Sequence, residues 1–338
     1  MQRKSGPPLL ADCVAPWRIH GALNDDRWRR EDPLMAIELT PITDGDITEV
    51  ADFLRTNMDS QIPWVRAWPP PWKVEAPNHG FMLRDGQRVG GALLAFYSDR
   101  LIEGRVERFC NMGAWCVLPA YRSHSIRLLR AMLAQEGYHV TCLSPIERVV
   151  AITAKFKFRS LDTSAVLIPN LPWPTLRGRT RISADPDIIA STLTDAELDL
   201  YYDHAQALAA RHLILIRGER SCYVMYRETL LKGIACAEIL HVSDPELFKL
   251  SINSLTRHLL LRHRLLATRA ELRTIAHRPL FSVKRNPRPK RYRSASLDPG
   301  QIDDLYSEFV CVPDMNQAPR FLRRSGNSSE DGGPSAVG

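Results

Sequence analysis

The sequence predicts an α/β (α+β) fold made of two tandem domains, each with a mixed, mostly antiparallel sheet flanked by helices. Three observations lead to this prediction. The length of 338 residues is enough for two domains of ordinary size. Apolar segments with strand periodicity alternate with segments of helical periodicity. The order of these segments in 36–168 recurs between 187 and 311, which suggests two copies of one fold.

The composition is that of a globular protein, with 44% hydrophobic and 25% charged residues. No segment approaches the ~20 apolar residues of a membrane span, and the N-terminus lacks the apolar core of a secretory signal. The seven cysteines are scattered without ligand spacing, which predicts reduced thiols and no metal site. We therefore expect a cytoplasmic protein, with a disordered leader over 1–35 and a disordered tail over 312–338.

The first predicted domain spans 36–170. Its clearest turn is Asp85-Gly86, because glycine supplies the positive φ that a tight hairpin needs. Ser144 to Glu147 has the pattern of a helix N-terminal capping box, with proline at the first helical position. In order, the predicted elements are strand 37–39, helix 47–54, hairpin 81–97, strand 105–118, helix 124–135, strand 138–143, a helix from 144, and strand 163–168, which closes the unit.

A proline-rich linker over 171–186 is predicted to lead into the second domain, 187–311. Asp244-Pro245-Glu246 is typical of the start of a helix. The turn His241–Pro245 has no phosphate-binding pattern, so this copy is predicted to be structural or to shape the acceptor site. Its predicted elements are helix 194–208, strands 212–217, 221–227 and 232–242, helix 244–261 and an apolar run at 265–268.

Positive charge is concentrated near the end of the chain. The segment from Arg257 to Arg293 contains twelve Lys and Arg residues and a single acidic residue, Glu271. The prolines in 284–293 predict an exposed, non-helical arm. Such an arm could be a solvated loop, or it could bind nucleic acid, an acidic membrane surface or an acidic or phosphorylated ligand. Nucleic acid is the least favoured of these partners, because no known nucleic-acid-binding module accompanies the arm.

The most informative stretch is an apolar strand ending at Val117, followed by Pro119, a basic turn over 122–127 and an amphipathic helix. A strand that runs into a helix N-terminus can bind phosphate, because the first amides of a helix have no internal acceptor and the helix dipole attracts anions. Arg122 and Arg127 could add charge-assisted hydrogen bonds. The alternative is an ordinary basic turn.

This motif and the order of elements around it resemble the GNAT acyltransferase superfamily, and the tandem arrangement resembles its two-domain members. The fragment Val117 to Arg122 and the sequence Phe156-Lys157-Phe158 carry the resemblance. Ser125 and Arg127 stand where the family usually has glycines. The resemblance implies that acyl-CoA is bound by the following residues: Val117, Arg122, Ser123, His124, Ser125, Ile126 and Arg127.

The resemblance also implies the chemistry. An acyl group, usually acetyl, passes from acetyl-CoA or another acyl-CoA to an amine by direct attack on the thioester. The pantetheine pairs with the strand ending at Val117, and the pyrophosphate rests on the amides of 123–127. The acceptor would be the amine of a small molecule, a glycan or a peptide. The tyrosine that often assists the departing thiolate in this family corresponds to Thr153.

The reaction needs a base to take the proton of the amine. The candidates are Glu107, Glu103, or a water held by Asn111, although Glu107 also fits a solvated strand position and Asn111 a bulge or turn. Three tryptophans in a proline-rich loop could wall the acceptor site or pack locally. They are Trp64, Trp68 and Trp72.

The leading prediction is therefore an acyl-CoA-dependent N-acyltransferase. The alternative is a catalytically inactive GNAT-like binding or scaffold protein. A basic adaptor that binds nucleic acid is a third, less favoured possibility. The acceptor, the acyl-chain length and the oligomeric state stay open at this stage.

Overall fold

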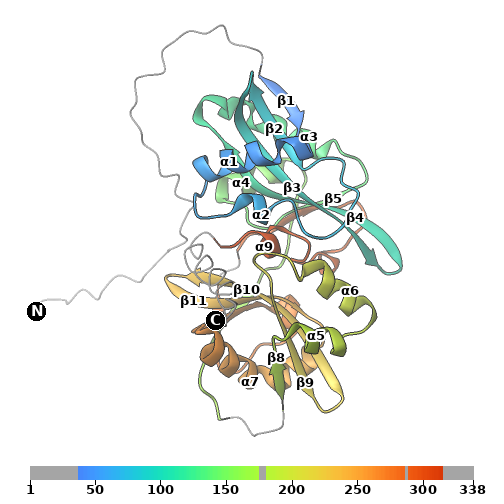
Figure 1. The fold of residues 1–338 in the computed structure, drawn as a ribbon, viewed down its shortest axis with the longest axis vertical. Coiled ribbons are helices and arrows are strands. Elements are labelled where there is room, and N and C mark those ends of the chain that lie inside the picture. Colours follow the sequence, from blue (N-terminus) through green and yellow to red (C-terminus); the bar gives the residue numbers. More distant parts are fainter. Residues whose placement is uncertain (1–36, 175–179, 286–287, 315–338) are drawn as a thin grey trace, which may run out of the picture.

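The computed structural model describes residues 37–174, 180–285 and 288–314, and it contains two seven-stranded sheets, one in each half of the molecule (Figure 1). The whole of the predicted leader, which includes Cys13, most of the predicted tail and the middle of the predicted linker lie outside these residues. The first half contributes β1 (Glu38–Pro41), α1 (Ile47–Asn57), α2 (Trp64–Ala67), β2 (Gly80–Asp85), β3 (Arg88–Ile102), β4 (Arg105–Val117), α3 (Ser125–Leu133), β5 (His139–Cys142), α4 (Glu147–Lys155), β6 (Arg159–Ser160) and β7 (Ala165–Pro169).

The second half repeats this order of elements, which confirms the predicted mixed, mostly antiparallel sheets with flanking helices. Its strand β8 lies inside the segment predicted to be a linker and pairs with β9 at the edge of the second sheet. The elements are β8 (Arg181–Ser183), α5 (Pro186–Thr192), α6 (Asp195–His204), β9 (Arg211–Arg217), β10 (Arg220–Leu231), β11 (Ile234–Val242), α7 (Pro245–His263), β12 (Ala267–Glu271), α8 (Leu272–Ile275), β13 (Val283–Arg285), β14 (Arg291–Arg293) and α9 (Glu308–Cys311).

The two sheets exchange a strand. The first sheet has the order β1-β2-β3-β4-β5-β14-β6, and the second has the order β8-β9-β10-β11-β12-β7-β13. The strand predicted at 163–168 does form, as β7, but it pairs with β12 and β13 and does not close the first sheet. That prediction was wrong because the periodicity of a segment marks a strand but not its partner. Neither half completes its own sheet.

The basic run near the end of the chain is also integrated into the fold. Strand β14 lies between β5 and β6, with Tyr292 buried. Lys290 is buried as well and forms ion pairs with Glu271 at 2.7 Å and Asp304 at 2.6 Å. The prediction of an exposed arm is therefore wrong for 290–292, where the chain joins the two halves, whereas Arg293 is exposed.

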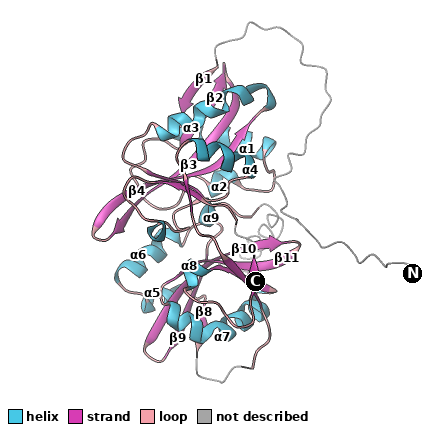
Figure 2. Cartoon of the chain, turned by 180° about the vertical axis from the view of Figure 1, so that it is seen from behind, coloured by secondary structure: helices cyan, strands magenta, loops and turns pink. Residues whose placement is uncertain are grey.

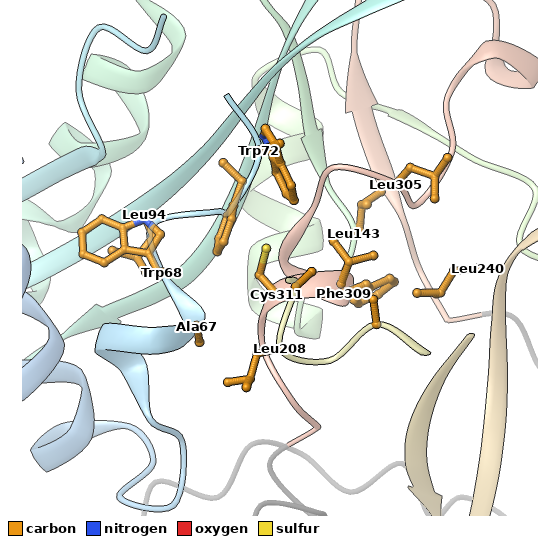
Figure 3. Close-up of a cluster of buried hydrophobic side chains, with 14 of the residues drawn as sticks. Ala67, Trp68, Trp72, Leu94, Leu143, Leu208, Leu240, Leu305, Phe309 and Cys311 are labelled. Atoms are coloured by element: carbon orange, nitrogen blue, oxygen red, sulfur yellow. The ribbon is translucent and has the colours of Figure 1, made fainter. Parts of the chain in front are cut away.

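Helices cover the faces of both sheets, and a common core joins the two halves. Helix α3 packs Leu128, Leu129 and Met132 on one face of the first sheet. The other face packs against α1 and α2 and continues into the second half. We call this continuous cluster the shared core. Figure 3 shows part of it, with Phe309 and Cys311 of α9 among side chains from both halves, including Trp72, Leu143, Leu208 and Leu240.

Strand periodicity explains how one sheet serves two clusters. Along β9, Leu213 and Leu215 point to the side covered by α7, whereas Ile214 points into the shared core. Successive side chains of a strand point to opposite faces, so an apolar run of this kind is buried on both sides. Helix α7 covers the face of the second sheet that is turned away from the shared core, and α9 lies between the halves (Figure 2). This arrangement brings α9 against the first sheet.

Candidate active site

The centre of the candidate site is the point where β4 and β5 separate. The two strands pair in parallel over only three residues of each, Phe109–Asn111 with His139–Thr141. Strand β4 then continues to Val117, and a bulge against β3 puts Ala114 at φ +39°. Among the described strands, none pairs with this side of β4 beyond Asn111. The backbone edge of 112–117 can therefore pair with an extended ligand, as in strand addition.

A carboxyl group from the far end of the chain occupies this junction. Helix α9 places Glu308 so that its backbone N–H donates to Asn111 Oδ1 at 2.9 Å. Its Oε1 accepts a hydrogen bond from Ser144 Oγ at 2.6 Å, just after β5. A Cβ built on Gly113 would lie only 2.8 Å from Oε2. Glu308 thus fills the angle between β4 and β5, next to the bulge.

The environment of Glu308 sets its protonation. Burial raises the pKa of this carboxyl to about 7, although the hydrogen bond from Ser144 and the charge of Arg227 act in the opposite direction. The residue itself is 8% exposed, while Ser144 beside it is exposed to solvent. A carboxyl with a pKa near neutrality and a polar neighbour at the surface is suited to accept and release a proton.

Ser144 does not have its predicted role. The N-cap of α4 is Ile146, and the hydroxyl of Ser144 is used by Glu308 instead. The capping prediction was wrong because the chain stays extended for two more residues. Asn111 makes two hydrogen bonds through its side chain. Its Nδ2 donates to Thr141 Oγ1 at 3.1 Å, and its Oδ1 accepts from the backbone N–H of Glu308. Its proposed hold on a water stays a prediction.

The turn between β4 and α3 is a 3₁₀ helix, Pro119–His124, that runs directly into α3. The ring of Tyr121 lies on Gly90, where an added Cβ would be 2.8 Å from the ring, and its hydroxyl donates to Asp85 at 2.9 Å. The close approach therefore requires glycine at position 90. The turn is held in one conformation by a ring contact and a hydrogen bond.

Because this turn is helical, fewer groups of 122–127 can contact a phosphate than the sequence predicts. The amide of Ser125 already donates to the carbonyl of Arg122, so it is not available to a phosphate. Arg127 donates to the carbonyl of Ile37 at 2.9 Å and lies 3.4 Å from His124 Nδ1. The side chains left at the surface are those of Arg122 and Ser123. Val117 packs on Gly91. Ile126 packs against the apolar cluster that α3 forms with the first sheet. Both side chains therefore pack next to the turn.

With this geometry in place, comparison with solved structures identifies the fold. A GCN5-related N-acetyltransferase from Anabaena variabilis aligns over 76% of this chain and 72% of its own, with a TM-score of 0.51 and 11% identity. This chain has the GNAT fold. A protein from Enterococcus faecalis, described as a probable N-acyltransferase of unknown function, aligns over 77% and 73% with a TM-score of 0.52 and 13% identity. No protein-family model and no curated protein matches the sequence.

The second GNAT-like half has an equivalent junction, but ion pairs close it. Strands β11 and β12 pair in parallel with Glu238 opposite Arg269, and these two side chains form an ion pair. Arg227 contacts the same carboxylate at 2.7 Å. Burial alone would raise the pKa of Glu238, but the two guanidinium groups hold it well below its usual range. The carboxylate of Glu238 at this junction is therefore fixed in its charged form by the ion pairs.

The other sequence-predicted residues lie elsewhere in the first half. Glu107 lies in β4 two residues before its paired segment with β5, and it contacts His139 of β5 at 2.8 Å. Its use as a base stays a prediction. Glu103 lies at the hairpin turn after β3 and accepts a hydrogen bond from Gln301. Thr153 is buried and donates to the carbonyls of its own helix.

The three tryptophans of the proline-rich loop are buried in the shared core. Trp72 Nε1 donates to the carbonyl of Tyr97 at 2.7 Å, and Trp64 Nε1 donates to that of Asp59 at 3.0 Å. Trp68 packs edge-on against His79. Their predicted role as an acceptor wall is untested, and in this structure they join the loop to both halves.

Sequence reasoning missed Glu308 altogether. Its partners Asn111 and Ser144 are 197 and 164 positions away in the sequence, and the segment around it reads as a short tail helix. A useful signal was the acidic residue set among Phe309, Val310 and Cys311, because a charge within an apolar run is costly to bury without a purpose.

Within the described ranges, no group of three or more His, Cys, Asp or Glu side chains could hold a metal ion. No helix in the described part of the chain is long and apolar enough to cross a membrane. The six cysteines that the structure describes are free thiols.

Proposed function

We propose that the first half binds an acyl-CoA and transfers its acyl group to an amine, with Glu308 as the general base. One observation carries the proposal: a buried carboxyl with a pKa near 7 lies where β4 leaves β5, beside an unpaired strand edge. The GNAT fold supports the reaction class, because the solved structures that share it include an N-acetyltransferase.

The chemistry follows from the position of this carboxyl. The amine nitrogen attacks the thioester carbonyl, so a C–N bond forms and the C–S bond breaks. The ionised Glu308 takes the proton that the nitrogen loses, and the proton then passes to the departing thiolate, which leaves as a free thiol. A base whose pKa lies near the working pH is efficient in such a transfer. Asn111 and Ser144 act as positioning residues, since each holds Glu308 by one hydrogen bond.

The rest of the acyl-CoA would extend from this point toward α3. The pantetheine would pair with the open edge of β4 up to Val117. Its phosphates would lie near the side chains of Arg122 and Ser123, at the start of α3, which has no acidic residue in its first turn. The acyl group would be acetyl or a longer chain, and the acceptor would be the amine of a small molecule, a glycan or a peptide.

The test is release of thiol from acetyl-CoA in the presence of a panel of amines. We expect amine-dependent release by the wild-type chain, and Glu308→Gln should lower kcat/KM by about 10²- to 10⁴-fold. Glu107→Gln is the matched control, because that carboxyl also faces β5 but contacts His139. It should change the rate by no more than a few-fold. Equal losses in the two variants would contradict the assignment of Glu308.

A catalytically inactive GNAT-like binding protein is the second candidate. Two observations favour it: the amide of Ser125 is already bonded, and α9 occupies the junction of β4 and β5. Titration with acetyl-CoA separates the candidates. No detectable binding, and no difference between wild type and Arg122→Ala, would support the inactive protein.

A further inference from the structure

The second half exposes a group of large apolar side chains at the edge of its sheet. Leu280 is 95% exposed, Phe281 65% and Val283 60%. We call these three residues the apolar tip. Exposed apolar residues are ordinary when they are scattered, whereas adjacent ones on one feature indicate an interaction site.

The tip is presented by an ordered turn. Arg278 Nη2 donates to the carbonyl of Ser282 at 3.3 Å, and Ser282 Oγ donates to the carbonyl of Pro279 at 2.6 Å. Strand β13 then continues the chain, pairing with β7 as the last strand of its sheet. The apolar side chains are therefore held outward by hydrogen bonds on either side of them.

Further apolar groups extend the tip. The rings of Trp173 and Phe281 lie 5.3 Å apart between centroids. Leu171 and Leu266 are 40% and 55% exposed, and the amide of Asn170 donates to the carbonyl of Leu266, which places these two segments side by side. The apolar surface is thus built from three separate segments at one end of the second sheet.

The charge next to the tip is positive only. From Leu272 to Leu297 the sequence has no Asp or Glu. Lys284 and Arg285 follow the tip on the outer strand, and both are exposed and have no acidic partner among the described residues. Arg262 and Arg264, just before Leu266, are exposed in the same way.

This combination selects among the possible partners. A nucleic acid would neutralise the charges but offers no apolar environment to Leu280. A second copy docked tip to tip would place like charges against each other, which is unfavourable. An anionic lipid surface offers both requirements, since its head groups attract basic residues and its acyl boundary accepts apolar side chains. We propose that the apolar tip and its basic neighbours dock this protein on an anionic bilayer surface.

The experiment is co-sedimentation of the full chain with vesicles of phosphatidylcholine alone or mixed with phosphatidylglycerol. We expect retention on the mixed vesicles only, decreasing as salt is added. Leu280→Asp with Phe281→Asp should abolish retention, and Lys284→Glu with Arg285→Glu should lower the bound fraction at least about tenfold.

The matched control is Leu101→Asp with Val106→Asp. These side chains are 74% and 66% exposed at the hairpin of the first half, away from the basic segment. The control variant should bind vesicles like the wild type, and thermal melting should show that all variants are folded. No retention of wild type at low salt, or equal losses in tip and control variants, would overturn the proposal. A dimer that the tip variants disrupt would overturn it too, by assigning the tip to a second copy.

Discussion

The junction of β4 and β5 in the first half and that of β11 and β12 in the second half have the same strand geometry and opposite electrostatics. In the first, Glu308 is buried without an ion pair to any residue that the structure describes, and its pKa is raised to about 7. In the second, Glu238 is equally buried but contacts Arg227 and Arg269, and its pKa is lowered. A buried carboxyl can exchange a proton near neutral pH only where no cation fixes its charge.

The helices that follow the two junctions, α3 and α7, also differ in the charge at their N-termini. Helix α3 has no acidic residue in its first turn, and Arg122 precedes it. Helix α7 is capped by Asp244, whose side chain accepts from the amide of Leu247, and Glu246 lies in its first turn. The second helix N-terminus is thus already neutralised by the chain itself, which leaves no attraction for a phosphate. The comparison supports the proposal that the first half binds acyl-CoA and that the second half has a structural role.

The largest effect on stability should come from breaking the closed junction. Glu238→Gln leaves Arg227 and Arg269 buried without their counter-charge, which should lower the free energy of unfolding by about 3–5 kcal/mol. Urea denaturation measures it. Arg55→Ala, which removes an exposed ion pair with Asp52, is the control and should cost less than about 1 kcal/mol. A loss in Glu238→Gln as small as in the control would mean that the second junction is not held by its ion pairs.

Removing the buried carboxyl of the first junction, Glu308, should have the opposite effect on stability. Because the native pKa of Glu308 is raised, the native state holds a proton that the unfolded chain releases near pH 4.5. Stability from this group is therefore present below about pH 4.5 and is lost as pH rises through about 7. Glu308→Gln should raise the free energy of unfolding at pH 8 by on the order of 1–3 kcal/mol and have little effect at pH 4.

Unfolding curves of wild type and Glu308→Gln at the two pH values measure this difference. A variant that is less stable than wild type at pH 8 would show that the ionised carboxylate stabilises the fold. That result would remove the physical basis for its role as a base.

The smallest effects are expected from substitutions at the N-termini of α3 and α7, and they should differ between the two helices. Asp244→Ala removes a cap and should cost about 1 kcal/mol of stability without changing affinity for acetyl-CoA. Arg122→Ala should weaken acetyl-CoA binding several-fold and leave the melting temperature unchanged, because this side chain is exposed. Calorimetric titration and thermal melting of both variants check the contrast. Weaker acetyl-CoA binding by Asp244→Ala would refute the assignment of binding to the α3 N-terminus alone.

Local features of this fold were predictable from the sequence, and long-range ones were not. The hairpin at Asp85-Gly86, the cap at Asp244 and the strand before Pro119 all depend on neighbours within a few residues. The partner of β7 depends on β12, about a hundred residues later. The position of Glu308 depends on Asn111, 197 residues earlier. Local pattern fixes an element, whereas the exchange of strands decides which sheet and which site it joins.

We propose that only the first junction binds acyl-CoA, and isothermal titration of the full chain with acetyl-CoA tests this proposal. The titration should show one site per chain, weakened by Arg122→Ala and unaffected by Asp244→Ala. Two sites, a site lost only when the second half is altered, or no binding would contradict it.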